Sequence, residues 1–242
     1  MHRLDPNKLI TEIINLKKAV ELRQIPPAGY FLLSFFHGLL EEAGVNSIEL
    51  IPNQESRFYI EGEDNKPISL WVKPDQVLSI KCGVLYKHEY ETEAIKFFDM
   101  ICNKQKEPFC VLDIGANWGL FSRQIINLNK QFINKIFCYE PDKDNFVILQ
   151  RNLDYFSNTE LKNIGLGFKT QSQKIFKAPN NDGNYSLYKD AMSFNQFIED
   201  NVRIINASHE MDNWLKYETN FFWKTDTQGH DEVIATSLPL EF

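Results

Sequence analysis

The chain has 242 residues, 43% of them hydrophobic and 24% charged, and carries a net charge of −7 at pH 7. This length can bury the core of one domain of ordinary size with a small appendage. The acidic balance argues against a nucleic-acid backbone as the partner, so we expect no nucleic-acid binding. The four cysteines have no C-x-x-C spacing, which favours reduced thiols and a cytoplasmic protein.

The sequence predicts no membrane span. The N-terminus, M-H-R-L-D-P-N, is polar and lacks the apolar region of a signal peptide. The most apolar stretch, residues 30–40, is much shorter than the roughly 20 residues that a membrane helix needs. We therefore expect this stretch to be part of a core helix.

Residues 1–85 are predicted to form an N-terminal α+β appendage. Apolar residues at helical spacing predict a helix over 9–20, and residues 28–43 predict a second helix that is apolar nearly all round. Such a helix needs cover on several sides, so it is either a core helix or the interface of a homodimer. Alternation with a period of two predicts strands over 57–60 and 68–72.

The segment 109–119, F-C-V-L-D-I-G-A-N-W-G, predicts the first unit of a nucleotide-binding fold. Its apolar start suits a strand that is buried on both faces, and Asp113 lies near the end of that strand. Gly115, Asn117 and Gly119 follow at alternate positions before a predicted helix, and we expect them to bind the cofactor, because such a loop lets a ligand approach bare backbone. Dinucleotide loops have a third glycine, and a carboxylate before the loop would repel a pyrophosphate. A carboxylate can instead accept hydrogen bonds from an ammonium group, and S-adenosylmethionine has an ammonium group and no phosphate.

A second strand, 135–139, is predicted to end at Glu140, about 21 residues after Gly119. An acidic residue at this point can accept hydrogen bonds from both ribose hydroxyls of a nucleoside. The alternative is an ordinary βαβ unit in which Asp113 and Glu140 only cap helices or face solvent. The loop, the spacing and the acidic strand end together favour a nucleoside cofactor.

Three segments resemble the FkbM-type methyltransferases, and they occur in the order of that family. They are D-I-G-A-N-W-G, then Y-E-P-D-K-D-N-F, then K-T-D-T-Q-G-H-D-E at 224–232. The resemblance implies a methyltransferase domain over 86–242, with a Rossmann-like, doubly wound and mostly parallel α/β sheet of the class I methyltransferase type. It also implies S-adenosyl-L-methionine as the cofactor and a hydroxyl of a sugar, glycan or secondary metabolite as the methyl acceptor.

Four further features are predicted around these motifs. Residues 160–164 predict the third strand of the sheet, which places Asn163 near an adenine. A small hairpin strand is expected at 173–177 and the fourth sheet strand at 220–224. Residues 178–186 form either a plain surface loop or a lid over the site.

The loop after the fourth strand supplies the candidate catalytic residues. In a doubly wound sheet this loop opens beside the cofactor loop, and methyl transfer to oxygen benefits from a group that removes the acceptor's proton. His230 has the pKa best suited to a base, whereas Asp226 lies nearer the strand end and should point into the cleft. The family pattern matches Lys224 and Asp226 but leaves His230 at a variable position, and Asp226 could instead cap a helix. No metal is expected, because the segment shows no clear ligand set.

Only four strands of the expected sheet can be assigned, so we expect the methyltransferase domain to be incomplete at its C-terminal end. Residues 238–242 alternate as a half-buried strand would, which predicts a fifth strand beside the fourth.

Three functions are compatible with the sequence. The leading hypothesis is an S-adenosylmethionine-dependent O-methyltransferase. The alternatives are a non-catalytic module that binds a nucleoside cofactor or another partner, and an NAD-dependent dehydrogenase. The missing third glycine counts against the dehydrogenase.

Overall fold

The computed structural model describes residues 45–49, 56–61, 67–73, 92–128, 131–179, 181–191 and 196–238. The chain divides into Met1–Gly44 and Val45–Phe242, and every described residue lies in the second unit. The predicted helices before residue 44, and with them the homodimer interface over 28–43, lie outside the described residues. The predicted domain boundary at residue 85 stays a prediction.

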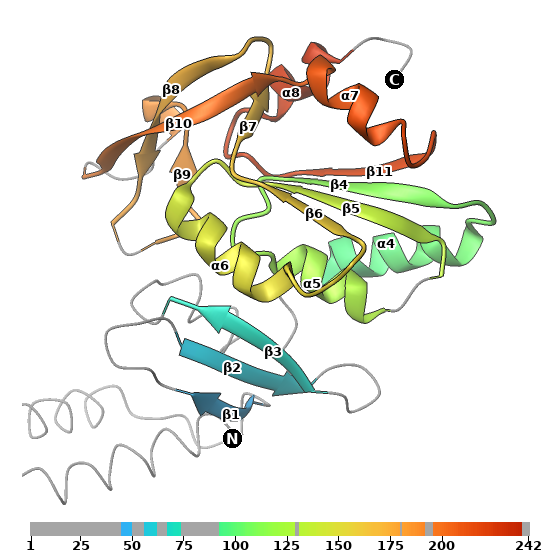
Figure 1. The fold of residues 1–242 in the computed structure, drawn as a ribbon. Helices are drawn as coiled ribbons and strands as arrows, with labels where there is room; N and C mark the ends of the chain where they lie inside the picture. The colour runs from blue at the N-terminus through green and yellow to red at the C-terminus, as the bar shows by residue number, and fades with distance from the viewer. Residues whose placement is uncertain are drawn as a thin grey trace, which may run out of the picture. The chain divides into compact units, whose positions relative to one another are not determined.

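The centre of the described fold is a four-stranded sheet in which all neighbouring strands run parallel. Its order is β11-β4-β5-β6, and Figure 1 shows it between two sets of helices. The strands are β4 (Phe109–Ile114), β5 (Ile133–Tyr139), β6 (Thr159–Lys162) and β11 (Phe221–Thr225). The four predicted sheet strands and the α/β class are therefore confirmed.

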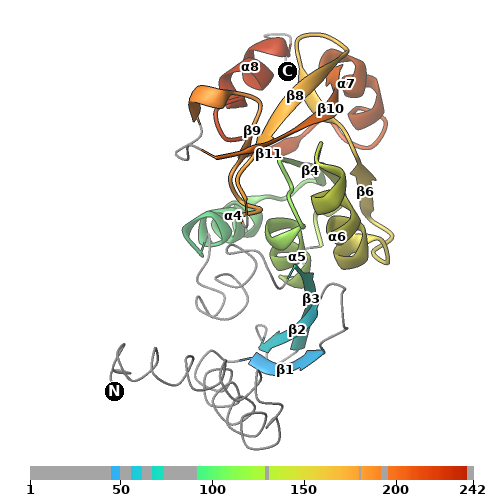
Figure 2. The same ribbon diagram turned by 90° about the vertical axis from the view of Figure 1, so that its left-hand side faces the viewer.

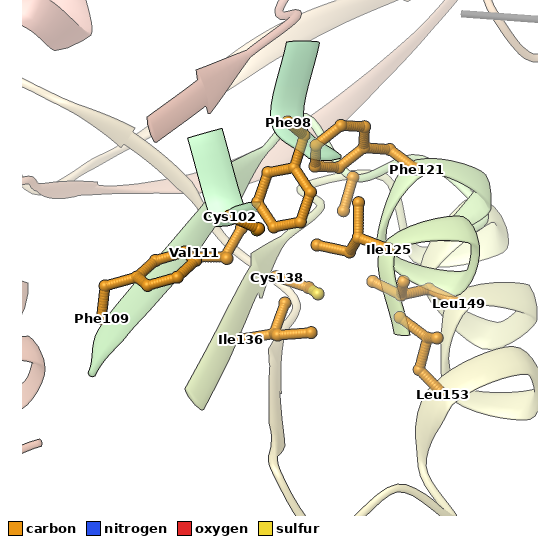
Figure 3. Packing of buried hydrophobic residues seen from close by; sticks show 11 residues of the cluster. Phe98, Cys102, Phe109, Val111, Phe121, Ile125, Ile136, Cys138, Leu149 and Leu153 are labelled. Atoms are coloured by element: carbon orange, nitrogen blue, oxygen red, sulfur yellow. The ribbon is translucent and has the colours of Figure 1, made fainter. Parts of the chain in front are cut away.

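Both faces of this sheet are covered, which explains the unbroken apolar start of β4. All six of its residues are buried. Phe109 and Val111 pack on one face against α4 (Thr92–Lys104), α5 (Leu120–Asn127) and α6 (Lys143–Leu153), as Figure 3 shows. Cys110 and Leu112 pack on the other face, in the cluster that contains α7 (Ser208–Trp214) and α8 (Asp231–Ser237). The sheet is therefore doubly wound, as predicted.

The strand order creates a switch point between β4 and β11. From β4 the chain moves outward to β5 and β6 on one side, and it returns later to pair β11 with the other side of β4. When the connections from two adjacent parallel strands run in opposite directions, a crevice forms between them at the carboxyl ends of the strands. This is the place in the fold where a ligand site is expected.

A second sheet, which the sequence predicted only in part, lies between β6 and β11 in the chain. Its order is β7-β10-β8-β9, and Figures 1 and 2 show it beside the carboxyl ends of the central strands. It consists of β7 (Gly165–Gly167), β8 (Gln171–Lys177), β9 (Tyr185–Ser186) and β10 (Ile198–Asn206), and a short 3-10 helix, η3 (Lys189–Ala191), follows β9. The predicted hairpin strand is confirmed as part of β8. The strand β10 was not predicted, although Val202 and Ile204 alternate with polar residues and are buried.

An antiparallel sheet of three strands precedes these elements. It contains β1 (Val45–Glu49), β2 (Ser56–Glu61) and β3 (Pro67–Val72), so the two predicted strands are confirmed as parts of β2 and β3. The side-chain amide of Asn152 on α6 accepts a hydrogen bond from the Trp71 N–H (2.6 Å) and donates to the Trp71 carbonyl (3.0 Å). The same amide donates to the Trp118 carbonyl (2.7 Å). One buried side chain thus joins β3, α6 and the loop before α5.

Of the residues predicted to form a fifth strand, 238–242, the structure describes only Leu238, so that strand stays a prediction. Residues 231–237 form α8, and Leu238 follows in a bend with its side chain buried in the core. Residues 239–242 lie outside the described residues. Among the described strands, β11 pairs with β4 alone.

None of the described helices is long and apolar enough to cross a membrane.

The buried Asn152 amide provides a first prediction. Asn152→Ala should lower the free energy of unfolding by about 2–4 kcal/mol, because it removes three hydrogen bonds from backbone groups at a buried junction. The matched control is Asn103→Ala on the exposed face of α4, where the amide donates to Asp99. The control should change the free energy of unfolding by less than about 0.5 kcal/mol. Urea denaturation followed by circular dichroism measures both, and equal effects would contradict the role given to Asn152.

Candidate functional site

A pocket opens at the switch point. The loops after β4, β5 and β11 line it, and residues of the second sheet, among them Leu166, Ile175 and Tyr185, form the opposite wall. Its empty volume is about 960 Å³ when the space open to solvent is included. The pocket therefore lies where the strand order predicts a ligand site.

The two glycines after β4 are required by packing within the protein. Gly115 has φ +76°, and a Cβ there would lie 2.1 Å from the carbonyl oxygen of Asp226 in the loop after β11. Gly119 has φ +88°, and its Cβ would lie 2.8 Å from Cδ1 of Leu149 on α6. Close approach of other protein segments therefore requires both glycines, and their predicted contact with a ligand stays a prediction.

Glu140 lies at the end of β5 on the pocket wall, as predicted, and is only 5% exposed. Its Oε2 accepts a hydrogen bond from the Asn117 N–H and its Oε1 from the Asp142 N–H, both at 2.8 Å. These bonds fix the carboxyl group, and each oxygen keeps a second lone pair that can accept from a ligand hydroxyl. Burial raises the pKa of Glu140 to about 8.

Asn163 is not a lining residue of the pocket. Its side-chain amide donates to the carbonyls of Glu140 (2.8 Å) and Pro141 (3.1 Å). The residue thus holds the turn that presents Glu140. Its predicted contact with an adenine stays a prediction.

Asp113 and Lys224 form an ion pair across β4 and β11. The two residues are paired in register, and Asp113 Oδ1 lies 3.1 Å from Lys224 Nζ. The other oxygen of Asp113 accepts from the Ser122 hydroxyl at 2.6 Å. Asp113 is completely buried and does not line the pocket, whereas Lys224 does. A direct contact between Asp113 and a ligand therefore stays a prediction, and the structure places Lys224 in front of it.

Asp226 lies at the exposed edge of the pocket. Its backbone N–H donates to the Ile114 carbonyl (3.0 Å), and its Oδ1 accepts from the side chain of Gln228 (3.1 Å). The predicted orientation toward the cleft is consistent with this position, because Asp226 lines the pocket. The carboxylate can be reached by a molecule that enters from solvent.

His230 also lines the pocket, but both of its ring nitrogens bind protein groups. Nε2 lies 3.1 Å from the Leu166 carbonyl, and Nδ1 lies 2.9 Å from the Tyr188 hydroxyl. A carbonyl only accepts, so Nε2 carries the proton and Nδ1 of the neutral ring accepts from Tyr188. Burial lowers the pKa of His230, which favours this neutral form. The arrangement suits a structural histidine better than the predicted base.

The segment after β8 is hydrogen-bonded both to the loop after β4 and to the loop after β11. The Asp182 carbonyl accepts from the side chains of Asn117 (2.9 Å) and Asn145 (3.3 Å), and the Ser186 hydroxyl donates to the Gln228 carbonyl (2.7 Å). Neither Asp182 nor Tyr188 was assigned a role from the sequence. Both lie in or beside a stretch of turn-forming residues, whose composition gives no indication of side-chain contacts. The lid role of residues 178–186 stays a prediction.

The residues present fit a nucleoside cofactor. Glu140 offers fixed acceptors on the pocket wall, and the buried Oδ1 of Asn117 has no hydrogen-bond partner among the described residues, so a donor of a bound ligand would satisfy it. No group of three or more His, Cys, Asp or Glu side chains in the described part of the chain is arranged to hold a metal ion.

No protein-family model and no curated protein matches the chain. Among solved structures, the chain is similar to methyltransferase FkbM from Methylobacillus flagellatus KT, with 18% sequence identity and a TM-score of 0.35. The similarity covers 54% of this chain and 28% of that protein, so the chain spans little more than a quarter of its length. A similarity this distant and partial does not assign a function, which must be argued from the site.

Gly115 provides a second prediction. Gly115→Ala should lower the free energy of unfolding by about 3–5 kcal/mol, because the new Cβ meets a backbone carbonyl that can move only if the β11 loop moves. Gly229→Ala is the matched control, since Gly229 has φ +99° but its Cβ would meet no atom closer than 3.7 Å. The control should cost only about 1–2 kcal/mol, from the left-handed backbone alone. If thermal and urea denaturation gave the same loss of unfolding free energy for both variants, the close contact between Gly115 and the Asp226 carbonyl would not matter for stability.

The raised pKa of Glu140 predicts a dependence of stability on pH. Between its ordinary pKa of 4.5 and about 8, the folded state holds the Glu140 proton more tightly than the unfolded state. The stabilisation from this proton is complete below pH 4.5 and disappears as the pH rises through 8, with a slope of at most about 1.4 kcal/mol per pH unit.

Glu140→Gln removes this ionisation. The unfolding free energy of the native protein minus that of the variant should therefore fall as the pH rises from 5.5 to 8.5. Urea denaturation at four pH values measures it. Glu199→Gln, on an exposed part of β10, should give a difference that is constant over the same range. A constant difference for Glu140→Gln as well would contradict the raised pKa.

Proposed function

We propose that the chain is an S-adenosylmethionine-dependent methyltransferase that transfers a methyl group to a hydroxyl oxygen. The observation that carries the proposal is Glu140. It lies on the wall of the switch-point pocket, at the end of the strand next to β4, with both oxygens oriented by backbone N–H groups. This is the position from which a carboxylate binds the ribose hydroxyls of a nucleoside.

The remaining residues of the site suit the two ends of such a cofactor. Glu140 and Asn117 would hold the nucleoside, and the loop from Gly115 together with Lys224 would face the amino-acid end. When bound, S-adenosylmethionine supplies an electrophilic methyl group. The sequence resemblance to the FkbM-type methyltransferases supports this choice over other nucleoside cofactors.

For the acceptor, Asp226 is the best-placed residue. Its carboxylate lies at the exposed edge of the pocket and can accept the hydrogen bond of an incoming hydroxyl, orienting it and taking its proton. His230 is less suited to this task, because its ring is held by Tyr188 and Leu166. We propose a hydroxyl of a sugar, glycan or secondary metabolite as the acceptor.

An NAD-dependent dehydrogenase is the second enzyme that this site could support. The ion pair with Lys224 compensates the Asp113 charge, so repulsion of a pyrophosphate no longer argues against it. The loop does argue against it. The positions of the second and third glycines of a dinucleotide loop are occupied by Asn117 and Leu120, and both side chains are present where a pyrophosphate would approach the backbone.

Titration with S-adenosylhomocysteine tests the proposal. We expect micromolar binding by isothermal titration calorimetry and no binding of NADH. At pH 9, above the Glu140 pKa of about 8, Glu140→Ala should weaken S-adenosylhomocysteine binding by about 10-fold to 100-fold, because hydrogen bonds to a charged group contribute about 1.5–3 kcal/mol. Glu199→Ala, which removes an exposed carboxylate on β10, is the control and should bind as the native protein does.

Two results would overturn the proposal. One is the absence of S-adenosylhomocysteine binding by the folded protein. The other is tight binding of NADH, which would favour the dehydrogenase. If the cofactor binds but a labelled methyl group is transferred to no member of a library of hydroxyl compounds, the chain is a non-catalytic binding module.

A further inference from the structure

Lys224 is a charged residue of the pocket wall, at the carboxyl ends of β4 and β11. Its Nζ lies 3.1 Å from Asp113 Oδ1 and 3.1 Å from the Gly115 carbonyl, above the face of the Phe121 ring. The side chain is 16% exposed and lines the pocket, whereas Asp113 has no exposed surface at all. A molecule that enters the pocket therefore meets the ammonium group before the carboxylate.

The two oxygens of Asp113 face groups of the protein. Oδ2 accepts the Ser122 hydroxyl at 2.6 Å, and Oδ1 lies 3.1 Å from Lys224 Nζ in an ion pair, although it accepts no hydrogen bond among the described residues. A ligand ammonium group could reach Asp113 only by displacing Lys224, and that would move one cation aside to admit another. Binding of an anionic group at Lys224 can leave the ammonium beside Asp113 and the Gly115 carbonyl, where it already lies.

We propose that Lys224 binds the α-carboxylate of the amino-acid part of the cofactor, and that Asp113 is a positioning residue that holds Lys224. This inference rests on the proposed function. It reverses the sequence-based expectation, in which Asp113 accepts hydrogen bonds from the ammonium group of the ligand. It also moves Lys224 from the candidate catalytic residues to the residues that recognise the cofactor.

Four ligands separate the two charged groups of the amino-acid part. They are S-adenosylhomocysteine, its analogue with a 3-aminopropyl chain, which lacks only the carboxylate, its analogue with a 3-carboxypropyl chain, which lacks only the amine, and 5′-methylthioadenosine, which lacks both. Their dissociation constants are measured by isothermal titration calorimetry with the native protein and with Lys224→Met.

In the native protein, loss of the carboxylate should weaken binding by about 10-fold to 100-fold, as expected for a charge-assisted hydrogen bond. In Lys224→Met, the same loss should change the dissociation constant by less than about 3-fold. Binding of 5′-methylthioadenosine should be the same in both proteins, since it has no carboxylate. Lys174→Met, in an exposed ion pair of β8 with Glu199, is the matched control and should keep the native preference.

Lys224→Met leaves the buried Asp113 without its cation, which destabilises the folded protein. A second variant, Asp113→Asn with Lys224→Met, therefore removes both charges. This double variant should also lose the preference for the carboxylate. The ratio of the dissociation constants of the 3-carboxypropyl analogue and S-adenosylhomocysteine, which reports the preference for the amine, should equal that of the native protein. Circular dichroism confirms that each variant is folded before titration.

Two results would overturn the inference while leaving the proposed function intact. One is an unchanged preference for the carboxylate in both variants. The other is a preference for the amine that disappears when Asp113 is replaced, which would return Asp113 to the ligand. If neither S-adenosylhomocysteine nor 5′-methylthioadenosine binds the native protein, the proposed function itself fails.

Discussion

The buried ion pair between Asp113 and Lys224 is the interaction on which the site depends. It links the strands β4 and β11 at their carboxyl ends, where both chains leave the sheet. Removing one partner of a buried pair leaves an uncompensated charge and costs about 3–5 kcal/mol. Because the pair also fixes the lysine beside the Gly115 carbonyl, the same contact that joins the strands holds an ammonium group on the pocket wall.

The other walls of the pocket are held by contacts of the same kind, in which a polar group serves the fold and the site at once. Glu140 takes its orientation from backbone N–H groups of the loop after β4 and of its own turn. Asp142 caps α6 and forms an ion pair with Lys177 of β8, so the second sheet is attached beside Glu140. These bonds arrange the pocket before any ligand enters, which reduces the entropy that binding must overcome.

Much of the central fold could be predicted from the sequence. The apolar run of β4, the glycine loop and the acidic end of β5 are local patterns, and each leads to the element that the structure contains. The presence of Asp113, Glu140, Lys224 and Asp226 at strand ends followed from the same reasoning, since parallel strands bring their carboxyl ends to one edge. The strand β10 was missed because its neighbours β7 and β8 stabilise it from outside its own segment.

The sequence by itself determined which residues reach the switch point, because strand periodicity and the parallel order of β4 and β5 are encoded locally. Only the tertiary structure decided which partners those residues have there. Asp113 and Lys224 are 111 positions apart, and nothing in either segment shows that their charges meet. The pairing of His230 with Tyr188 likewise depends on how η3 packs beside the loop after β11. Side-chain partners are set by packing between distant segments, and a linear pattern does not contain that information.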